Sequence, residues 1–393
     1  MAMTRHCSSA GREGGFSLIE LMIGMTLGVM LLAGVLKVFD GANRSNLEIQ
    51  KSSQLIDNGQ YAMQVLGNEL HGAGFYGPYY ILPAAPAILP DPCSFASLTD
   101  LKAALAVPVQ TYPAADLFNK PSLPSSCAGY GLTANNVLPG SDVLVVRRAD
   151  SEVLSSAPVA NEVYLQSNSN DAAVQIGNPT GFALGALDAD NTVATVGTDA
   201  SGQAATVLKR ANQPGARPAV DGDRIAADIY KLHVTVYFVA PCSVPADGSD
   251  ICTGAADDGG HPMPTLKRLE LGTAGGATTM TMAALVEGVE RISVDFGIDD
   301  SPATASAVTN FTGDGVADAW LHEPALADWP KVVVARMRLL VRAPGITAGY
   351  TDTKNFAMGM IGTTEAANDN YKRHLFDQAL ALTNLSQRRQ IPQ

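Results

Sequence analysis

An apolar segment near the N-terminus is the strongest pattern in the chain. Residues 16–36 number 21, and Glu20 is the only charged residue among them. A helix rises ~1.5 Å per residue, so this segment would be about 30 Å long, which matches the hydrocarbon core of a bilayer. The pattern predicts a membrane-spanning helix over residues 16–36 that carries one carboxylate.

Beyond the apolar run, hydrophobic residues recur at intervals close to helical spacing, with charged and amide residues between them. Gly72, Ala73 and Gly74 form a helix stop, and Pro78 follows soon after. We therefore predict an amphipathic continuation of the same helix over residues 37–74, whose apolar face packs on the sheet of the following domain. The hydrophobic positions are Leu47, Leu55, Ile56, Ala62, Val65, Leu66 and Leu70.

Residues 75–393 have the pattern of a β-rich domain. Residues 75–140 are dense in Pro, Ala, Ser and Tyr, and we predict irregular structure there apart from a short helix around Leu98–Leu105. Runs rich in β-branched residues follow between turn clusters, and the last of them could instead be helical. These runs are Asp142–Arg147, Glu162–Gln166, Thr206–Lys209, Leu232–Val239, Leu266–Leu271, Val289–Ile298, Val332–Arg342 and Leu375–Leu382. The fold class that follows is α+β, a long N-terminal helix packed on a mainly antiparallel β-rich head.

Charge and composition narrow the class of protein. The chain has 26 Lys and Arg against 38 Asp and Glu, and its basic residues are scattered, so we expect no nucleic acid partner for the head. The 37 glycines and 23 prolines, with only 16% charged residues, are typical of a loop-rich exported domain. Arg388 and Arg389 are predicted to lie in a solvated tail, with a contact patch as the alternative.

The head has four cysteines, Cys93, Cys127, Cys242 and Cys252. Two local pairs, Cys93 with Cys127 and Cys242 with Cys252, are the simplest arrangement, although the sequence permits three connectivities. A metal site is the alternative, but no C-x2-C spacing is present and no histidine lies at ligand spacing beside them. Disulfides are the interpretation that we favour, and they indicate an oxidising compartment such as a periplasm or cell surface.

The position of the small residues decides what the apolar segment is. An ordinary secretory signal places them after the apolar run, whereas here Gly14 and Gly15 come before it. The sequence from Gly15 to Glu20, Gly-Phe-Ser-Leu-Ile-Glu, followed by the apolar run, resembles the class III signal of type IV prepilins and type II secretion pseudopilins. The resemblance implies a leader over residues 1–15, cleavage between Gly15 and Phe16, N-methylation of Phe16 by a prepilin peptidase, and a filament role for Glu20. Cys7 lies within that leader.

A carboxylate inside an apolar span is costly unless it is paired, so Glu20 is expected to be functional. The resemblance implies that Glu20 pairs with the free amine of Phe16 on a neighbouring subunit. Basic residues do not fix the membrane orientation, because Arg5 and Arg12 precede the span while Lys37, Arg44 and Lys51 follow it. The resemblance and the cysteines imply a single-pass inner-membrane protein with a periplasmic head before assembly, and a pilus or cell-surface location afterwards.

Four later segments resemble PilW-type minor pilins in particular. This likeness implies a minor pilin that takes part in assembling or initiating a type IV pilus, near its tip. The implied partners are other minor and major pilins, the prepilin peptidase and methyltransferase, and the pilus assembly machinery. The segments are Ser141–Arg148, Leu285–Glu290, Trp329–Arg336 and Tyr371–Phe376.

Two other classes stay open as alternatives. A minor pseudopilin of a type II secretion system shares the leader and the helix, although a head of this length is large for that family. A membrane-anchored periplasmic binding protein or adhesin would have a leader that only mimics a prepilin. No G-x-S-x-G, H-E-x-x-H or phosphate-binding loop is present, so we expect no enzyme and no catalytic residue.

One loop approaches a calcium-binding pattern. Asn310, Thr312, Asp314 and Asp318 place oxygen ligands near alternate positions around Gly313 and Gly315, but the twelfth position, Leu321, supplies no carboxylate. A surface turn at Asp314-Gly315 is the interpretation that we favour, with Ca²⁺ as the alternative. Apart from this Ca²⁺ hypothesis, we expect no cofactor.

Overall fold

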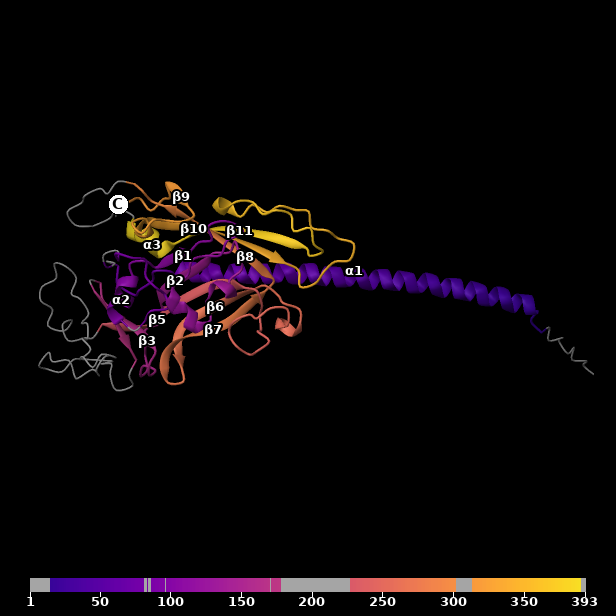
Figure 1. The fold of residues 1–393 in the computed structure, drawn as a ribbon, viewed down its shortest axis with the longest axis horizontal. Coiled ribbons are helices and arrows are strands. Elements are labelled where there is room, and N and C mark those ends of the chain that lie inside the picture. The colour runs from indigo at the N-terminus through magenta and orange to yellow at the C-terminus, as the bar shows by residue number, and fades with distance from the viewer. Residues whose placement is uncertain are drawn as a thin grey trace, which may run out of the picture. The chain divides into compact units, whose positions relative to one another are not determined.

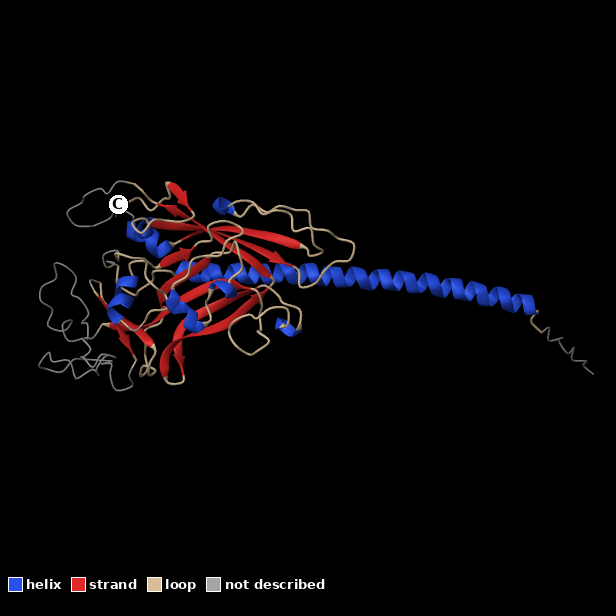
Figure 2. Ribbon diagram, in the orientation of Figure 1, coloured by secondary structure: helices blue, strands red, loops and turns tan. Residues whose placement is uncertain are grey.

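The computed structural model describes residues 15–80, 83, 86–95, 97–169, 171–177, 227–301 and 313–389. The chain forms two compact units, Met1–Ser53 and Gln54–Gln393, and helix α1 (Leu18–Gly72) begins in the first and ends in the second. Proline is absent from all 55 residues of α1, so no backbone donor is lost along it. The predicted apolar and amphipathic segments are thus parts of one helix (Figure 2).

Glycine ends α1 because the chain must turn sharply there. Gly74 has a φ of 72°, a conformation that residues with a side chain rarely adopt. Its N–H donates to the carbonyl of Arg147 on strand β2 at 2.9 Å, and a Cβ at this position would lie 2.7 Å from Leu385. The predicted stop at Gly72-Ala73-Gly74 is therefore confirmed, and it directs the chain into the head.

Two antiparallel sheets make up the head. The seven-stranded sheet has the order β1-β2-β5-β3-β4, and β6 and β7 extend it from β5. The four-stranded sheet has the order β11-β10-β8-β9. The strands of the first are β1 (Val109–Tyr112), β2 (Val143–Ala149), β3 (Val163–Ser167), β4 (Ala172–Ile176), β5 (Asp228–Ala240), β6 (Thr265–Ala274) and β7 (Ala277–Glu287), and those of the second are β8 (Val289–Ile298), β9 (Ala319–Leu321), β10 (Val332–Arg342) and β11 (Arg373–Ala381).

The main core lies between the head part of α1 and both sheets, which Figure 1 shows on opposite sides of that helix. The helix buries one face, on which Leu55, Gly59, Ala62, Leu66 and Leu70 recur at three- and four-residue spacing. A second core covers the other face of the seven-stranded sheet, where helix α2 (Leu98–Ala104) packs. This sheet is therefore buried on both faces, which explains the continuous apolar runs of its central strands.

Most of the predicted strands are confirmed, and the run at Leu375–Leu382 is strand β11 rather than a helix. The predicted run Thr206–Lys209 lies outside the described residues. Strands β1, β4, β7 and β9 were not predicted. Of these, β1 lies in the stretch predicted to be irregular, because its four residues are too few to show a period beside the prolines that flank them.

The prediction of a solvated tail at Arg388 and Arg389 was wrong. Both residues belong to helix α3 (Thr383–Arg389), and their guanidinium groups are largely buried. Arg389 Nε donates to Asp299 Oδ2 at 2.9 Å, and Arg388 Nη2 donates to the carbonyl of Gly74 at 2.7 Å. The tail ties the end of α1 to the four-stranded sheet, and such long-range pairing leaves no local signal in the sequence.

Candidate functional site

The apolar half of α1 is exposed along its whole length. Phe16 is 88% exposed and Leu18 is 77% exposed, and the large apolar side chains through Phe39 are exposed as well. An 18-residue window of α1 has a mean hydropathy of 2.1 with none of it buried, and within the described residues α1 is the one helix long and apolar enough to cross a membrane. A soluble fold would bury such a surface, so this half of α1 is built to contact lipid or other helices.

Glu20 belongs to a hydrogen-bonded cap at the start of α1. The Ser17 N–H donates to Glu20 Oε2 at 3.1 Å, and the Ile19 N–H donates to Ser17 Oγ at 3.3 Å. Reciprocal bonds of this kind are typical of a capping box, and the S-x-x-E spacing of Ser17 and Glu20 is the sequence signal for it. In the single chain the carboxylate is thus held next to the segment that contains Gly15 and Phe16.

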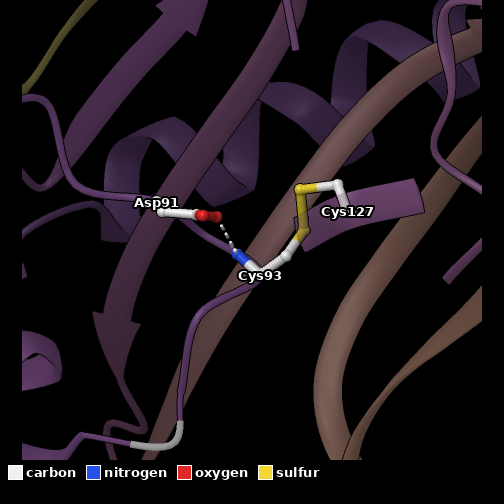
Figure 3. Close-up of side chains that lie close together, drawn as sticks. All are labelled: Asp91, Cys93 and Cys127. Atoms are coloured by element: carbon white, nitrogen blue, oxygen red, sulfur yellow. Dashed lines mark hydrogen bonds between the residues drawn. A yellow bond between two sulfur atoms is a disulfide. The ribbon is translucent and has the colours of Figure 1, made fainter. Parts of the chain in front are cut away.

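Both cysteine pairs form disulfides, Cys93 with Cys127 and Cys242 with Cys252. Figure 3 shows Asp91 beside the first of them, where its Oδ1 accepts from the Cys93 N–H at 2.9 Å. The disulfides fasten two loops that carry little regular structure of their own. Carboxylates lie close to both pairs, but the sulfur atoms are bonded to each other and are not thiolate ligands for a metal.

The candidate calcium residues are only partly described. Asn310 and Thr312 lie outside the described residues. Asp314 Oδ1 accepts from the Val316 N–H at 2.9 Å, and Asp318 Oδ2 accepts from the Asp300 N–H at 2.8 Å. These two carboxylates bind separate backbone groups, and Gly315 has a φ of 78°, which suits the favoured surface turn. Ca²⁺ binding stays the untested alternative.

A histidine between two buried aspartates was not foreseen from the sequence. His322 Nδ1 lies 3.1 Å from Asp295 Oδ1, and His322 Nε2 lies 3.5 Å from Asp142 Oδ1. Burial alone would lower the pKa of His322, but the hydrogen bonds and charges of Asp142 and Asp295 raise it to about 10. The imidazole is therefore a cation at neutral pH, and it links the start of β2 to β8.

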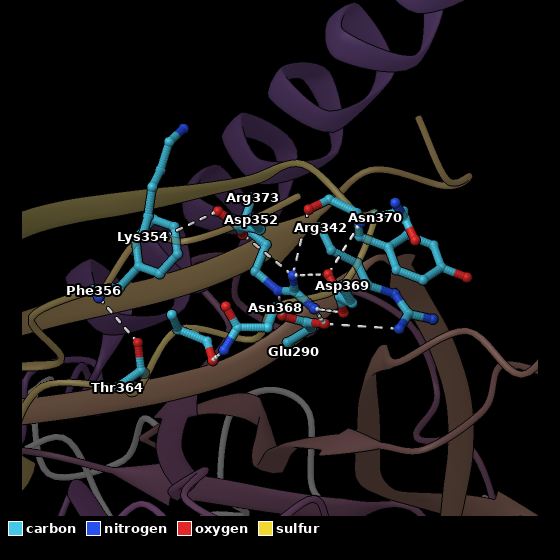
Figure 4. Close-up of polar contacts among 12 residues, drawn as sticks. Glu290, Arg342, Asp352, Lys354, Phe356, Thr364, Asn368, Asp369, Asn370 and Arg373 are labelled. Carbon is cyan, nitrogen blue, oxygen red and sulfur yellow. Dashed lines mark hydrogen bonds and ion pairs between the residues drawn. The ribbon is translucent and has the colours of Figure 1, made fainter. Parts of the chain in front are cut away.

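A second charged cluster is centred on Arg373, the first residue of β11. Its guanidinium group donates to Glu290 Oε2 at 2.6 Å, to Asp369 Oδ1 at 2.7 Å and to Asp352 Oδ2 at 3.2 Å. Figure 4 shows this group among the three carboxylates. Arg342 Nη1 also lies 3.7 Å from Glu290 Oε1. The bonds of Arg373 hold the long connection between β10 and β11 against the sheet, and we interpret the cluster as structural.

Comparisons with known proteins agree with these features. Residues 252–384 match the family described as type IV pilus-assembly protein W, and residues 11–36 match the prokaryotic N-terminal methylation motif. A search of curated proteins gives no match. Among solved structures, a type IV-like pilin from Thermus thermophilus is similar, with 15% sequence identity and a TM-score of 0.17. The alignment covers 39% of this chain and 79% of the pilin.

An N-terminal methylation motif, an exposed apolar helix and a β-rich head together define a type IV pilin-like protein. The match to the head covers β6 to β11, and hence the whole four-stranded sheet. Within the class of type IV pilin-like proteins, the part of the head over residues 252–384 is similar to the PilW type.

Proposed function

We propose that this protein is a minor pilin that takes part in assembling a type IV pilus and lies close to the pilus tip. The observation that carries the proposal is the exposed apolar half of α1, with Glu20 held beside Phe16 at its start. Cleavage after Gly15 creates a free amine at Phe16. In an assembled pilus Glu20 exchanges its bond to Ser17 for the amine of a neighbouring subunit.

The proposed path of the protein follows from the two parts of α1. Before assembly the apolar half lies in the inner membrane, and the head lies in the periplasm, where the two disulfides form. Assembly transfers the apolar half from lipid to the helices of other minor and major pilins. The work of the protein is then structural, and its head presents surfaces to partner subunits.

Processing is tested by mass spectrometry of the N-terminus, on protein isolated from cells that contain a prepilin peptidase. The expected chain begins at a methylated Phe16. A chain that still carries residues 1–15, or one that is cut after the apolar run, would remove the basis of the proposal.

The role of Glu20 is tested with Glu20→Gln, which keeps an acceptor for the Ser17 N–H but removes the charge. The variant should be processed and inserted in the membrane, yet be absent from sheared pili. Thr26→Val is the matched control, since Thr26 Oγ1 bonds only to carbonyls of its own helix. Equal amounts of the Glu20→Gln variant and the wild type in sheared pili would contradict the assigned role.

Position and biological role need a separate measurement. Deleting the gene should reduce the number of pili per cell, and labelled protein should be found at pilus ends in electron micrographs. Loss of protein secretion with normal piliation would instead support the pseudopilin alternative.

A further inference from the structure

A groove of about 480 Å³ runs between the head part of α1 and strand β11. Its floor is apolar and includes Met63, Phe376 and Leu380. The helix approaches the strand closely here, because Gly59 has no side chain and a Cβ in its place would lie 2.0 Å from the Phe376 ring. The shape of the groove therefore depends on Gly59, and its lining includes neither His322 nor Arg373.

One wall of the groove is the edge of a sheet. β11 is the terminal strand of its sheet and pairs with β10 from Arg373 to Ala381 without a register shift. The Ala343 N–H donates to the Lys372 carbonyl and the Leu382 N–H donates to the Val333 carbonyl, so the even-numbered residues of β11 face β10. The odd-numbered residues turn their N–H and C=O groups toward the open edge.

The open edge has no backbone partner in the described part of the chain. Leu375, Asp377, Ala379 and Ala381 make no backbone hydrogen bond to any described residue on that side. Edge strands commonly carry a proline, an unpaired charge or a bulge that prevents another strand from adding. β11 has no proline and no bulge, and its Arg373 and Asp377 are ion-paired with Glu290 and Arg336. The edge is therefore a template on which a further strand can form.

The opposite wall shows what kind of strand fits. Gln60, Gln64 and Asn68 lie one helical turn apart along α1, and Gln378 faces the groove from β11. All four side chains are exposed, and no described residue bonds to their carboxamides. A carboxamide offers a donor and an acceptor to a peptide backbone. Asp377 is the only carboxylate in the lining, and Arg336 neutralises it at 2.8 Å, so the groove favours an uncharged segment.

We propose that this groove receives an extended segment of another pilin subunit, which adds to the four-stranded sheet as a new strand beside β11. The segment has apolar residues at alternate positions, which contact Met63, Phe376 and Leu380. A second copy of this chain fits less well. If two β11 strands paired antiparallel with full overlap, the Asp377 carboxylates would face each other, which destabilises a strand pair. The identity of the partner as a pilin rests on the function proposed above.

The test places a photo-cross-linking amino acid, p-benzoylphenylalanine, at position 378 of the full-length chain in cells that assemble pili. Cross-linked peptides are identified by mass spectrometry. The expected product joins residue 378 to a segment of a different pilin subunit. A product with a second copy of this chain, with a protein that has no prepilin motif, or no product at all would overturn the proposal.

Two variant pairs link the product to the strand edge. Ala379→Pro removes an outward N–H that β10 does not use, whereas Ala379→Thr keeps it. The proline should reduce cross-linking at least about fivefold, the change expected for one lost backbone hydrogen bond, while the threonine leaves it unchanged. Equal cross-linking in Ala379→Pro and Ala379→Thr would contradict strand addition.

The second pair leaves every strand intact and so keeps the test valid if the proline variant fails to fold. Gln64→Glu puts a charge in the groove, and Gln54→Glu puts the same charge on an exposed part of α1 outside it. Only Gln64→Glu should reduce the product. The N-terminus is measured in the same samples, so that a missing product with a methylated Phe16 rejects the groove alone, whereas an uncut leader rejects the proposed function.

Discussion

Replacing His322 with glutamine should destabilise the head in a way that depends on pH. In the wild type the imidazolium of His322 lies between Asp142 and Asp295, whose side chains are 0% and 3% exposed. Glutamine can donate to one carboxylate but carries no charge. The variant therefore leaves Asp142 with backbone N–H donors but no cation, while Asp295 keeps its bond to Arg338.

The size of the effect follows from the pKa. An increase from 6.5 to about 10 corresponds to at most roughly 5 kcal/mol, at ~1.36 kcal/mol per pH unit. Removing one partner of a buried ion pair costs about 3–5 kcal/mol, and the amide of glutamine recovers part of it. We expect a loss of about 3 kcal/mol at pH 6. Because the folded pKa lies above the unfolded value, this stabilisation is complete below about pH 6.5 and disappears as the pH rises through about 10.

The assay is urea unfolding of the full-length chain in detergent micelles, with its disulfides intact, at pH 6 and at pH 10. Trp329 is 3% exposed and packs on Phe296, so its fluorescence should report the loss of the core. The gap between wild type and His322→Gln should narrow by more than half at pH 10. His374→Gln, at an exposed position, is the control and should show no such change. A gap that is the same at both pH values, or smaller than about 1 kcal/mol at pH 6, would refute the assigned role.

Three further changes test the packing of the head by unfolding experiments. Gly59→Ala should lower the free energy of unfolding by about 1–3 kcal/mol, because the new Cβ meets the Phe376 ring. Gly67→Ala, whose Cβ would lie 3.7 Å from its nearest neighbour, should raise it by up to about 1 kcal/mol through helix propensity. Equal effects would contradict the close approach of α1 to β11. Replacing both cysteines of a disulfide with serine should lower the free energy of unfolding by about 4 kcal/mol for Cys93 and Cys127 and by about 3 kcal/mol for Cys242 and Cys252. The difference follows from the loops that they close, with sequence separations of 34 and 10. The reverse order would argue against loop entropy as the cause. Arg389→Met should lower the free energy of unfolding by about 3–5 kcal/mol, because it leaves the buried Asp299 carboxylate without its ion pair. Arg336→Met breaks an exposed pair and should cost less than about 1 kcal/mol. An equally small loss for Arg389→Met would show that α3 does not stabilise the head.

The sequence predicted the elements whose pattern is repeated locally. Examples are the helix predicted at Leu98–Leu105 and the strands β2, β5, β8 and β10. Each strand is a run rich in β-branched residues between turn residues, so a single segment is enough to predict it. Strand β7 was missed because only two of its eleven residues are buried, so its Thr, Met and Ala residues show no regular alternation of apolar and polar positions. Exposed strands at a sheet edge have the least constrained composition.

The charged clusters could not be predicted from the sequence in the same way. Asp142, Asp295 and His322 lie far apart along the chain, and each has an unremarkable local context. Only the antiparallel register of β8 and the turn after β9 bring them together. The predicted tail at Arg389 was wrong for the same reason, since its partner Asp299 is 90 positions away. A burial pattern is periodic and visible in one segment, whereas an ion pair depends on two segments at once.

The exposed apolar half of α1 has an energetic cost in water that the folded head does not have. Ten leucine, isoleucine and valine side chains between Leu18 and Leu36 are each more than half exposed in the single chain. Burying such a side chain fully contributes about 1.5–3 kcal/mol, so together they represent on the order of 10 kcal/mol or more, comparable with the total stability of a folded domain. The single chain in water is therefore an unfavourable state. In the function proposed above, transfer of α1 directly from lipid to a bundle of other helices avoids that state, so the proposal requires membrane insertion and filament assembly to be coupled steps.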